Sequence, residues 1–203
     1  MTTPADLALP LELGDVVVEV GAGQGGETAY LAGQVGPTGQ VIAVEAHPET
    51  AAILRHRVAQ YANVEVVEAA VWDVVALVPF AANGDWERRS IVSADAEETI
   101  AVEATTLDTL FIKHGLVDVA LLKLNIEGGE VDALRNFRRL DLVRAAVVAC
   151  HDFLGRPTKA TVRALLERRG FDVTENPDAT EDWLRDYLFA TRIRRVFRGA
   201  DRR

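Results

Sequence analysis

Residues 16–26, VVVEVGAGQGG, place a run of β-branched residues directly before a cluster of glycines. The run predicts a buried strand, Val16–Val20, and the next residues predict a helix, Glu27–Val35, ended by Gly36-Pro37. Glycines between a strand and a helix let the backbone turn tightly and approach a ligand without a Cβ atom. The first N–H groups of the helix are free to bind that ligand. The loop therefore predicts an α/β fold with a ligand at the carboxyl end of the first strand.

The rest of the chain alternates strand-like and helix-like segments in the same way. Apolar β-branched runs predict further strands at Val41–Glu45, Val64–Val67, Val119–Leu124, Val143–Cys150, Phe171–Thr174 and Leu188–Ile193. Amphipathic spacing predicts helices from Pro48 to about Tyr61, and at Leu107–Lys113, Glu130–Phe137 and Pro157–Arg169. This alternation predicts an α/β, doubly wound, mostly parallel sheet that is covered on both faces.

The segment between the third and fourth predicted strands breaks this rhythm. Val71–Phe80 and Ile91–Val102 alternate as strands do, and the turn-forming sequence ANGD at residues 82–85 separates them. They predict an antiparallel β excursion at the sheet margin, over about residues 71–104. Because 203 residues is the length of one domain, we predict a single domain over residues 1–203 that contains this excursion.

Charge and composition exclude several classes of function. The net charge of −9 argues against a nucleic-acid-binding protein, because neutralising phosphates needs clustered Lys and Arg. The charge is uneven, since the segment from Tyr187 onward carries +5 and the residues before it carry −14. No apolar run reaches the ~18–20 residues that span a bilayer, and the start lacks the basic and apolar regions of a signal peptide. With one cysteine, Cys150, we expect a cytoplasmic protein without membrane association.

The glycine loop fits two ligand-binding patterns. The G-x-G-x-x-G pattern of dinucleotide-binding proteins is matched by Gly21, Gly23 and Gly26. The acidic-x-G-x-G-x-G pattern of S-adenosylmethionine enzymes is matched by Glu19, Gly21, Gly23 and Gly25. Glu19 favours the second pattern, because the ammonium group of S-adenosylmethionine is a suitable partner for a carboxylate at this point. The alternative is a glycine turn that serves packing only.

Two further strand ends contribute to the predicted cofactor site. Glu45 ends the second predicted strand, where a carboxylate can accept hydrogen bonds from both ribose hydroxyls of either cofactor. Glu68-Ala69-Ala70 follow the third strand and are expected to border the adenine, although small residues here also suit ordinary packing. The complete predicted cofactor site is Glu19, Gly21, Ala22, Gly23, Gly25, Thr28, Glu45, Ala46, Glu68, Ala69, Ala70 and Asn125.

A second polar group follows the fourth predicted strand, in VALLKLNIEGGE at residues 119–130. Lys123 interrupts an otherwise apolar strand, so its ammonium must be paired or must reach the open strand end. Period-two alternation puts Lys123, Asn125 and Glu127 on one side if the strand runs that far. An internal ion pair between Lys123 and Glu127 that fixes the turn is the structural alternative.

Together these motifs resemble the FkbM-like family. VVVEVGAGQGGETAYLA, VIAVEAHPE, VEVVEAAVWD, TTLDTL and LLKLNIEGGEVDAL follow in the order and spacing of that family, over roughly Val16 to Cys150. The resemblance implies a class I S-adenosylmethionine-dependent methyltransferase with a seven-stranded Rossmann-like sheet and an antiparallel C-terminal strand. It also implies S-adenosyl-L-methionine as cofactor, S-adenosyl-L-homocysteine as product, and O-methylation of a small-molecule hydroxyl on a natural product or sugar. Asn125 departs from the Asp that the family usually carries, and an amide cannot act as a base.

The expected catalytic residues are His151, Asn125, Glu127 and Lys123. His151 follows a predicted strand end, and an imidazole with an ordinary pKa near 6.5 can take a proton from a hydroxyl, so it is the first candidate base. A His that only binds a neighbouring loop is the alternative. Oxygen and nitrogen donors of Asn125, Glu127, His151 and Asp152 also suit a divalent metal, but no spacing requires one, and we predict no metal site.

Two other functions remain open from the sequence. A nicotinamide-dependent oxidoreductase would use the other glycine count, but the chain has no evident hydride-transfer pair. A non-catalytic relative that only binds the cofactor would explain Asn125. The expected partner is a small molecule, and a homo-oligomer is open. Trp72, Phe80 and Trp86 are candidates to stack on the acceptor, or belong to the core.

Overall fold

The computed structural model describes residues 4, 8–81, 91, 98–151, 158–176 and 182–192. Within these residues the main sheet has seven strands in the order β3-β2-β1-β7-β8-β10-β9. Every neighbouring pair is parallel except those of β10, which runs antiparallel to both β8 and β9. The predicted doubly wound, mostly parallel sheet with an antiparallel C-terminal strand is confirmed.

The strands lie where the β-branched runs predicted them. Those of the main sheet are β1 (Val16–Val20), β2 (Gln40–Glu45), β3 (Val64–Glu68), β7 (Val119–Leu124), β8 (Val143–Ala149), β9 (Phe171–Thr174) and β10 (Tyr187–Arg192). The α-helices are α1 (Gly26–Val35), α2 (Pro48–Val58), α3 (Leu107–Lys113), α4 (Glu130–Arg135) and α5 (Thr158–Arg168). Two short 3₁₀ helices that the sequence did not indicate are η3 (Arg138–Leu142) and η4 (Asp182–Asp186). None of the helices in the described ranges is long and apolar enough to cross a membrane.

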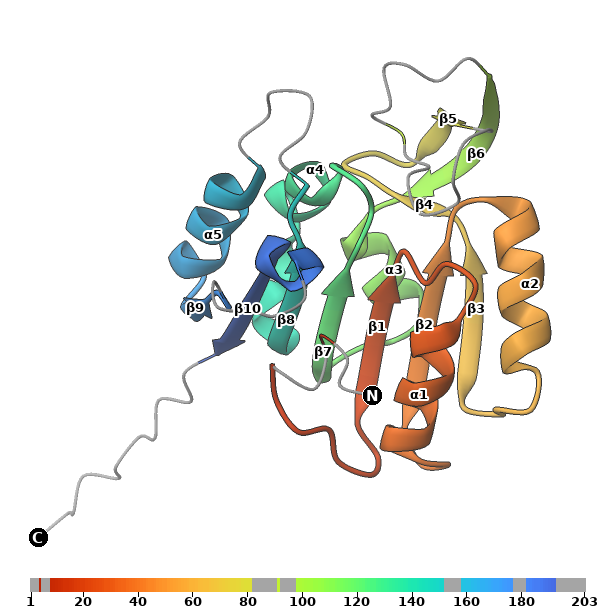
Figure 1. Ribbon diagram of the computed structural model, residues 1–203, viewed down its shortest axis with the longest axis horizontal. Coiled ribbons are helices and arrows are strands. Elements are labelled where there is room, and N and C mark those ends of the chain that lie inside the picture. The colour runs from red at the N-terminus through yellow and green to blue at the C-terminus, as the bar shows by residue number, and fades with distance from the viewer. Residues whose placement is uncertain are drawn as a thin grey trace, which may run out of the picture.

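The helices cover both faces of the sheet (Figure 1). Leu31 and Val35 of α1 pack with Val17 and Leu121 on one face, and α2 packs beside α1. On the other face, residues of α3, α4 and α5 share one buried cluster with the alternate residues of the same strands. Burial on both sides explains why the strands read as continuous apolar runs.

The order of the strands reverses at β1, and this reversal determines where the candidate site lies. From β1 the chain moves outward through β2 and β3, and then returns to place β7 on the other side of β1. Helices leave the two halves on opposite faces, so a crevice opens at the carboxyl ends of β1 and β7, where doubly wound folds bind ligands. Glu19 and Lys123 are register partners in this pair of strands.

The β excursion forms a small separate sheet beyond the carboxyl ends of β2 and β3 (Figure 1). Its strands are β4 (Ala70–Val71), β5 (Ala76–Ala81) and β6 (Thr99–Thr105), in the order β4-β6-β5. The expected antiparallel pair is therefore only partly right, because β4 pairs parallel with β6 and only β5 pairs antiparallel. The predicted first strand breaks after Val71, where the chain turns so that β4 and β5 lie on opposite sides of β6. Residues 82–90 and 92–97 lie outside the described residues.

Candidate functional site

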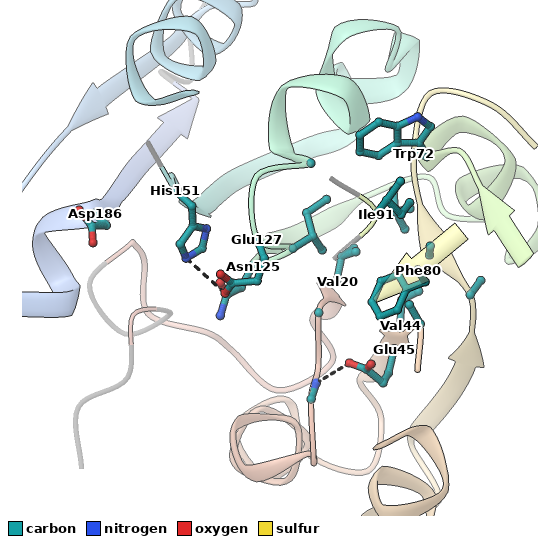
Figure 2. Close-up of a pocket in the computed structure, with 18 of the residues that line it drawn as sticks. Val20, Val44, Glu45, Trp72, Phe80, Ile91, Asn125, Glu127, His151 and Asp186 are labelled. Carbon is teal, nitrogen blue, oxygen red and sulfur yellow. Dashed lines mark hydrogen bonds and ion pairs between the residues drawn. The ribbon is translucent and has the colours of Figure 1, made fainter. Parts of the chain in front are cut away.

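A cavity of about 290 Å³ opens at the carboxyl ends of β1, β2 and β7 (Figure 2). In the figure Glu45 and Phe80 lie at one end, His151 and Asp186 lie at the other, and Asn125 and Glu127 lie between them. The remaining lining residues are Val20, Gly21, Gly23, Val44, Ala46, Ala69, Ala70, Val71, Trp72, Ile91, Ile126, Gly129 and Tyr187. Segments far apart in the sequence therefore meet at one end of the sheet.

The glycine loop forms one wall of this cavity. Because Gly21 has no side chain, the loop can lie directly against the segment that follows β7. Gly21 has φ +79°, and a Cβ atom there would lie 1.9 Å from the carbonyl oxygen of Asn125. Gly25, the N-cap of α1, has φ +82°, and a Cβ atom there would lie 2.5 Å from Leu54 Cδ1. Gly21 and Gly23 line the cavity, whereas Ala22 and Gly25 are not among the lining residues. The loop glycines thus serve both close approach and packing.

The carboxylate of Glu45 joins the glycine loop to the end of β2 by hydrogen bonds. Its Oε2 accepts a hydrogen bond of 2.9 Å from Gly23 N, and its Oε1 accepts one of 2.9 Å from His47 N. Each carboxylate oxygen has a further lone pair, so Glu45 can still accept hydrogen bonds from hydroxyl groups in the cavity. Glu45 therefore orders the loop and lines the cavity.

The three residues after β3 divide between the cavity and the surface. Ala69 and Ala70 line the cavity beside Ala46, as expected for residues that border a flat base. Glu68 is exposed, is absent from the cavity lining, and accepts a 2.7 Å hydrogen bond from Arg55. The structure therefore places the Glu68 carboxylate away from the predicted adenine position.

Glu19 and Lys123 form a buried ionic cluster below the loop and do not line the cavity. Glu19 is fully buried and accepts hydrogen bonds from Thr28 Oγ1 at 2.6 Å and from Lys123 Nζ at 3.0 Å. Glu27 lies 2.8 Å from the same ammonium. Burial opposes the charge of Lys123, but the two carboxylates outweigh it and raise its pKa. Lys123 is therefore charged, and Glu127, the partner in the alternative interpretation of the sequence, contacts His151 instead.

Strand β7 ends at Leu124, so the expected alternation stops before Asn125. Asn125 N continues the ladder to Val20 O at 2.9 Å, and its side chain reaches the cavity, where Oδ1 is buried without a hydrogen-bond partner. Glu127 has φ +54°, a left-handed conformation that non-glycine residues adopt rarely and that is common at functional sites. Lys123 thus belongs to the core, whereas Asn125 and Glu127 belong to the cavity.

His151 is held between two carboxylates. Its Nε2 lies 3.3 Å from Glu127 Oε1, and its Nδ1 lies 3.2 Å from Glu130 Oε1 (Figure 2 shows the Glu127 contact). Burial alone would lower the pKa of His151, but the hydrogen bond to Glu130 and the charges of Glu127, Glu130 and Asp186 raise it. The ring is thus contacted on both nitrogens, by Glu127 of the loop after β7 and by Glu130 of α4.

Glu130, Asp186 and Tyr187 belong to this end of the site but were not predicted. Asp186 ends η4 and Tyr187 starts β10, and Cys150 N donates to Asp186 O at 2.9 Å. Because β10 runs antiparallel to β8, its first residues meet the end of β8, and this pairing was the signal that could have indicated them. Burial raises the pKa of Tyr187 to about 12.

Two remaining expectations concern aromatic residues and metals. Trp72 and Phe80 line the cavity, and Trp86 lies outside the described residues. Asp152, one of the donors weighed for a divalent metal, also lies outside them. Among the residues that the structure describes, no three His, Cys, Asp or Glu side chains form a group that could hold a metal ion.

Comparison with known proteins identifies the family. A family profile described as the methyltransferase FkbM domain matches residues 19–173. An ornithine lipid N-methyltransferase of Singulisphaera acidiphila is 39% identical over 87 residues, which span 43% of this chain and 41% of that protein. The chain thus matches less than half the length of this relative.

Solved structures share the fold. The FkbM methyltransferase of Methylobacillus flagellatus has a TM-score of 0.61 and 17% identity, over 90% of this chain and 44% of that one. Fibrillarin of Aeropyrum pernix, which carries bound S-adenosyl-L-methionine, has a TM-score of 0.56 and 17% identity, over 93% of this chain and 73% of that one. The profile covers most of the chain and these folds agree with it, so the chain belongs to the FkbM family of S-adenosylmethionine-dependent methyltransferases.

Proposed function

We propose that the chain transfers a methyl group from S-adenosyl-L-methionine to the hydroxyl group of a small molecule, with His151 accepting the proton. The observation that carries this proposal is the pair of carboxylates on the His151 ring, Glu130 at Nδ1 and Glu127 at Nε2. A carboxylate on one ring nitrogen orients an imidazole so that the other nitrogen can exchange a proton with a substrate.

The residues at the Glu45 end fit the cofactor. Gly21 and Gly23 present backbone to the cavity, Glu45 offers lone pairs for ribose hydroxyls, and Ala69 and Ala70 offer a flat wall for adenine. The buried Oδ1 of Asn125 lacks a hydrogen-bond partner, and buried polar atoms of this kind are ordinarily satisfied. When bound, the cofactor supplies a methyl group on a positively charged sulfur, which is already a strong electrophile.

The chain then has two tasks, to align the acceptor oxygen and to take its proton. His151 faces the cavity, so an acceptor hydroxyl that replaces the Glu127 contact at Nε2 could donate its proton there. Glu130, 3.2 Å from Nδ1, stabilises the imidazolium that forms, and the negative charge of Glu127 beside the ring also favours it. Asn125 can bind the cofactor or the acceptor but cannot accept the proton.

The charges of the cavity lining favour a neutral or cationic acceptor. Its acidic residues are Glu45, Glu127 and Asp186, and within the described part of the chain no Lys or Arg lines it. An anionic acceptor would meet unfavourable charge, which also supports the proposal that nucleic acid is not a substrate. Trp72 and Phe80 provide an apolar wall against which the acceptor can pack.

Methylation of an amine is a second candidate. It is favoured by the relative from Singulisphaera acidiphila, which is named as an N-methyltransferase, and by the carboxylates that would attract an ammonium group. A panel of acceptors matched in skeleton, with a hydroxyl or an amine at the same carbon, separates the two. Transfer to the hydroxyl members supports O-methylation, whereas transfer only to the amines replaces it by N-methylation.

Glu45→Ala is expected to weaken the binding of S-adenosyl-L-methionine by roughly tenfold to a hundredfold, since a hydrogen bond to a charged group contributes about 1.5–3 kcal/mol. The dissociation constant is measured by titration calorimetry. Glu68→Gln is the matched control, because Glu68 is the register partner of Glu45 on β3 but lies outside the cavity. Equal affinities of the wild type and Glu45→Ala would remove Glu45 from the cofactor site.

A further inference from the structure

Glu130, the first residue of α4, carries a fully buried carboxylate. Its Oε1 accepts hydrogen bonds from Ile126 N at 3.3 Å and from Gly128 N at 3.2 Å. These two contacts close the turn that follows β7. Glu127 lies between the two donors, so Glu130 fixes the turn in which Glu127 takes its left-handed conformation.

The same oxygen of Glu130 lies 3.2 Å from His151 Nδ1. The second oxygen, Oε2, is buried without a hydrogen-bond partner. A carboxylate removed from water is costly unless a counter-charge and hydrogen bonds compensate it. The imidazole of His151 is placed to provide both, so the two side chains are expected to depend on each other.

We propose that Glu130 is a positioning residue, which holds His151 by its Nδ1–H so that Nε2 faces Glu127 and the acceptor. A contribution of Glu130 to catalysis rests on the proposed function, whereas its hydrogen bond to the His151 ring does not. A carboxylate bound to one ring nitrogen selects the tautomer and orientation of an imidazole, and replacing it by an amide disturbs both. Glu130 itself does not contact the acceptor, since it does not line the cavity.

Glu130 also contributes to the proton affinity of His151. Within the described residues, the carboxylates that raise the pKa of this ring are Glu127 on the loop after β7, Glu130 on α4, and Asp186 before β10. Each carboxylate favours the imidazolium. Removing the charge of Glu130 therefore lowers the pKa of His151, while Glu127 and Asp186 remain.

The test is an NMR titration of the full chain, with ¹⁵N-labelled histidine and without cofactor or acceptor. In the wild type we expect His151 to titrate above its ordinary pKa near 6.5 and, once neutral, to carry its proton on Nδ1. In Glu130→Gln we expect the pKa to fall and the Nδ1–H preference to be lost. Asp132→Asn removes another buried carboxylate of α4 and should leave the His151 signals unchanged.

Catalysis gives the second readout. Glu130→Gln is expected to lower kcat by roughly 10- to 100-fold while the dissociation constant of S-adenosyl-L-methionine stays within about twofold, as for residues that orient a reacting side chain. A change in affinity without a change in kcat would assign Glu130 to the cofactor site instead. Glu130→Asp keeps the charge but shortens the reach, and it is expected to restore the raised pKa only in part.

Failure of the positioning role and failure of the proposed function give different experimental results. If the neutral His151 of the wild type carries its proton on Nε2, or if Glu130→Gln leaves the titration unchanged, the positioning role is wrong. The tautomer measurement needs no variant, so it decides even if Glu130→Gln fails to fold. If the His151 titration behaves as expected but no acceptor is methylated, the proposed function fails and the hold of Glu130 on His151 stands.

Discussion

Replacing Lys123 by Met is expected to destabilise the chain by about 3–5 kcal/mol, the usual effect of removing one partner from a buried ion pair. Met has a similar length and no charge, so the change leaves the packing largely filled. Glu19 remains fully buried with only the Thr28 hydroxyl as a hydrogen-bond partner, and Glu27 loses its contact at 2.8 Å. Urea denaturation followed by circular dichroism measures the free energy of unfolding.

Two matched variants separate the loss of the charge from other effects. Arg55→Ala breaks the exposed ion pair with Glu68, and such pairs contribute only about 0–1 kcal/mol. The double variant Glu19→Gln/Lys123→Met removes both charges of the buried pair, and it should be more stable than Lys123→Met alone, since the Gln amide oxygen can still accept from Thr28. If Lys123→Met is as stable as the wild type, the three side chains do not form an ionic cluster.

The second large effect is expected at His151. His151→Gln should reduce kcat by about 10²- to 10⁴-fold, the usual contribution of a general base, and should leave the affinity for S-adenosyl-L-methionine nearly unchanged. Single-turnover kinetics with saturating cofactor measure the chemical step, and calorimetry measures binding. Gln keeps a polar side chain of similar size, so we expect the variant to fold. The same urea denaturation experiment checks this. A kcat equal to that of the wild type removes His151 from the base role.

The pH dependence of the reaction follows from the same group. A base acts when deprotonated, so kcat/KM rises with pH and levels off above the pKa of His151, which its carboxylate neighbours place above 6.5. Glu127→Gln removes one of these negative charges, lowers that pKa, and should move the rising limb to lower pH. A limb that stays in place would show that another group takes the proton.

The strands and helices were predictable because each is specified locally. The β-branched runs, the glycines and the helix-ending Gly36-Pro37 act over a few residues, and the observed elements follow them closely. The excursion was predicted less well, because whether β4 and β5 pair parallel or antiparallel with β6 depends on a turn at residues 72–75 that has no strong sequence signal.

The sequence was sufficient to predict which strand ends carry the site residues, but not which side chains contact one another. The sequence indicated the loop glycines, Glu45, Asn125, Glu127 and His151, which all line the cavity, Gly25 excepted. It did not indicate the partner of Glu19, because Lys123 is 104 residues away and the pairing depends on the register of β1 with β7. The local cue, an acidic residue before the glycines, suggested a cofactor ammonium, whereas an ammonium of the chain itself fills this role.

Glu130 was missed for a related reason. It follows Gly128-Gly129 in a stretch that reads as the polar start of a helix, where an acidic residue is ordinary. Only the arrangement of α4 against the end of β8 brings its carboxylate to His151. Such a contact joins two elements through the fold, so no spacing along the chain predicts it.

The most direct test of cofactor use is a calorimetric titration of the full chain with S-adenosyl-L-methionine, with S-adenosyl-L-homocysteine and NADH titrated in parallel. We expect one saturable site for both sulfur compounds, weakened in Glu45→Ala and unchanged in Glu68→Gln, and no saturable binding of NADH. Binding of NADH without binding of either sulfur compound would contradict the assignment of this cavity to S-adenosylmethionine.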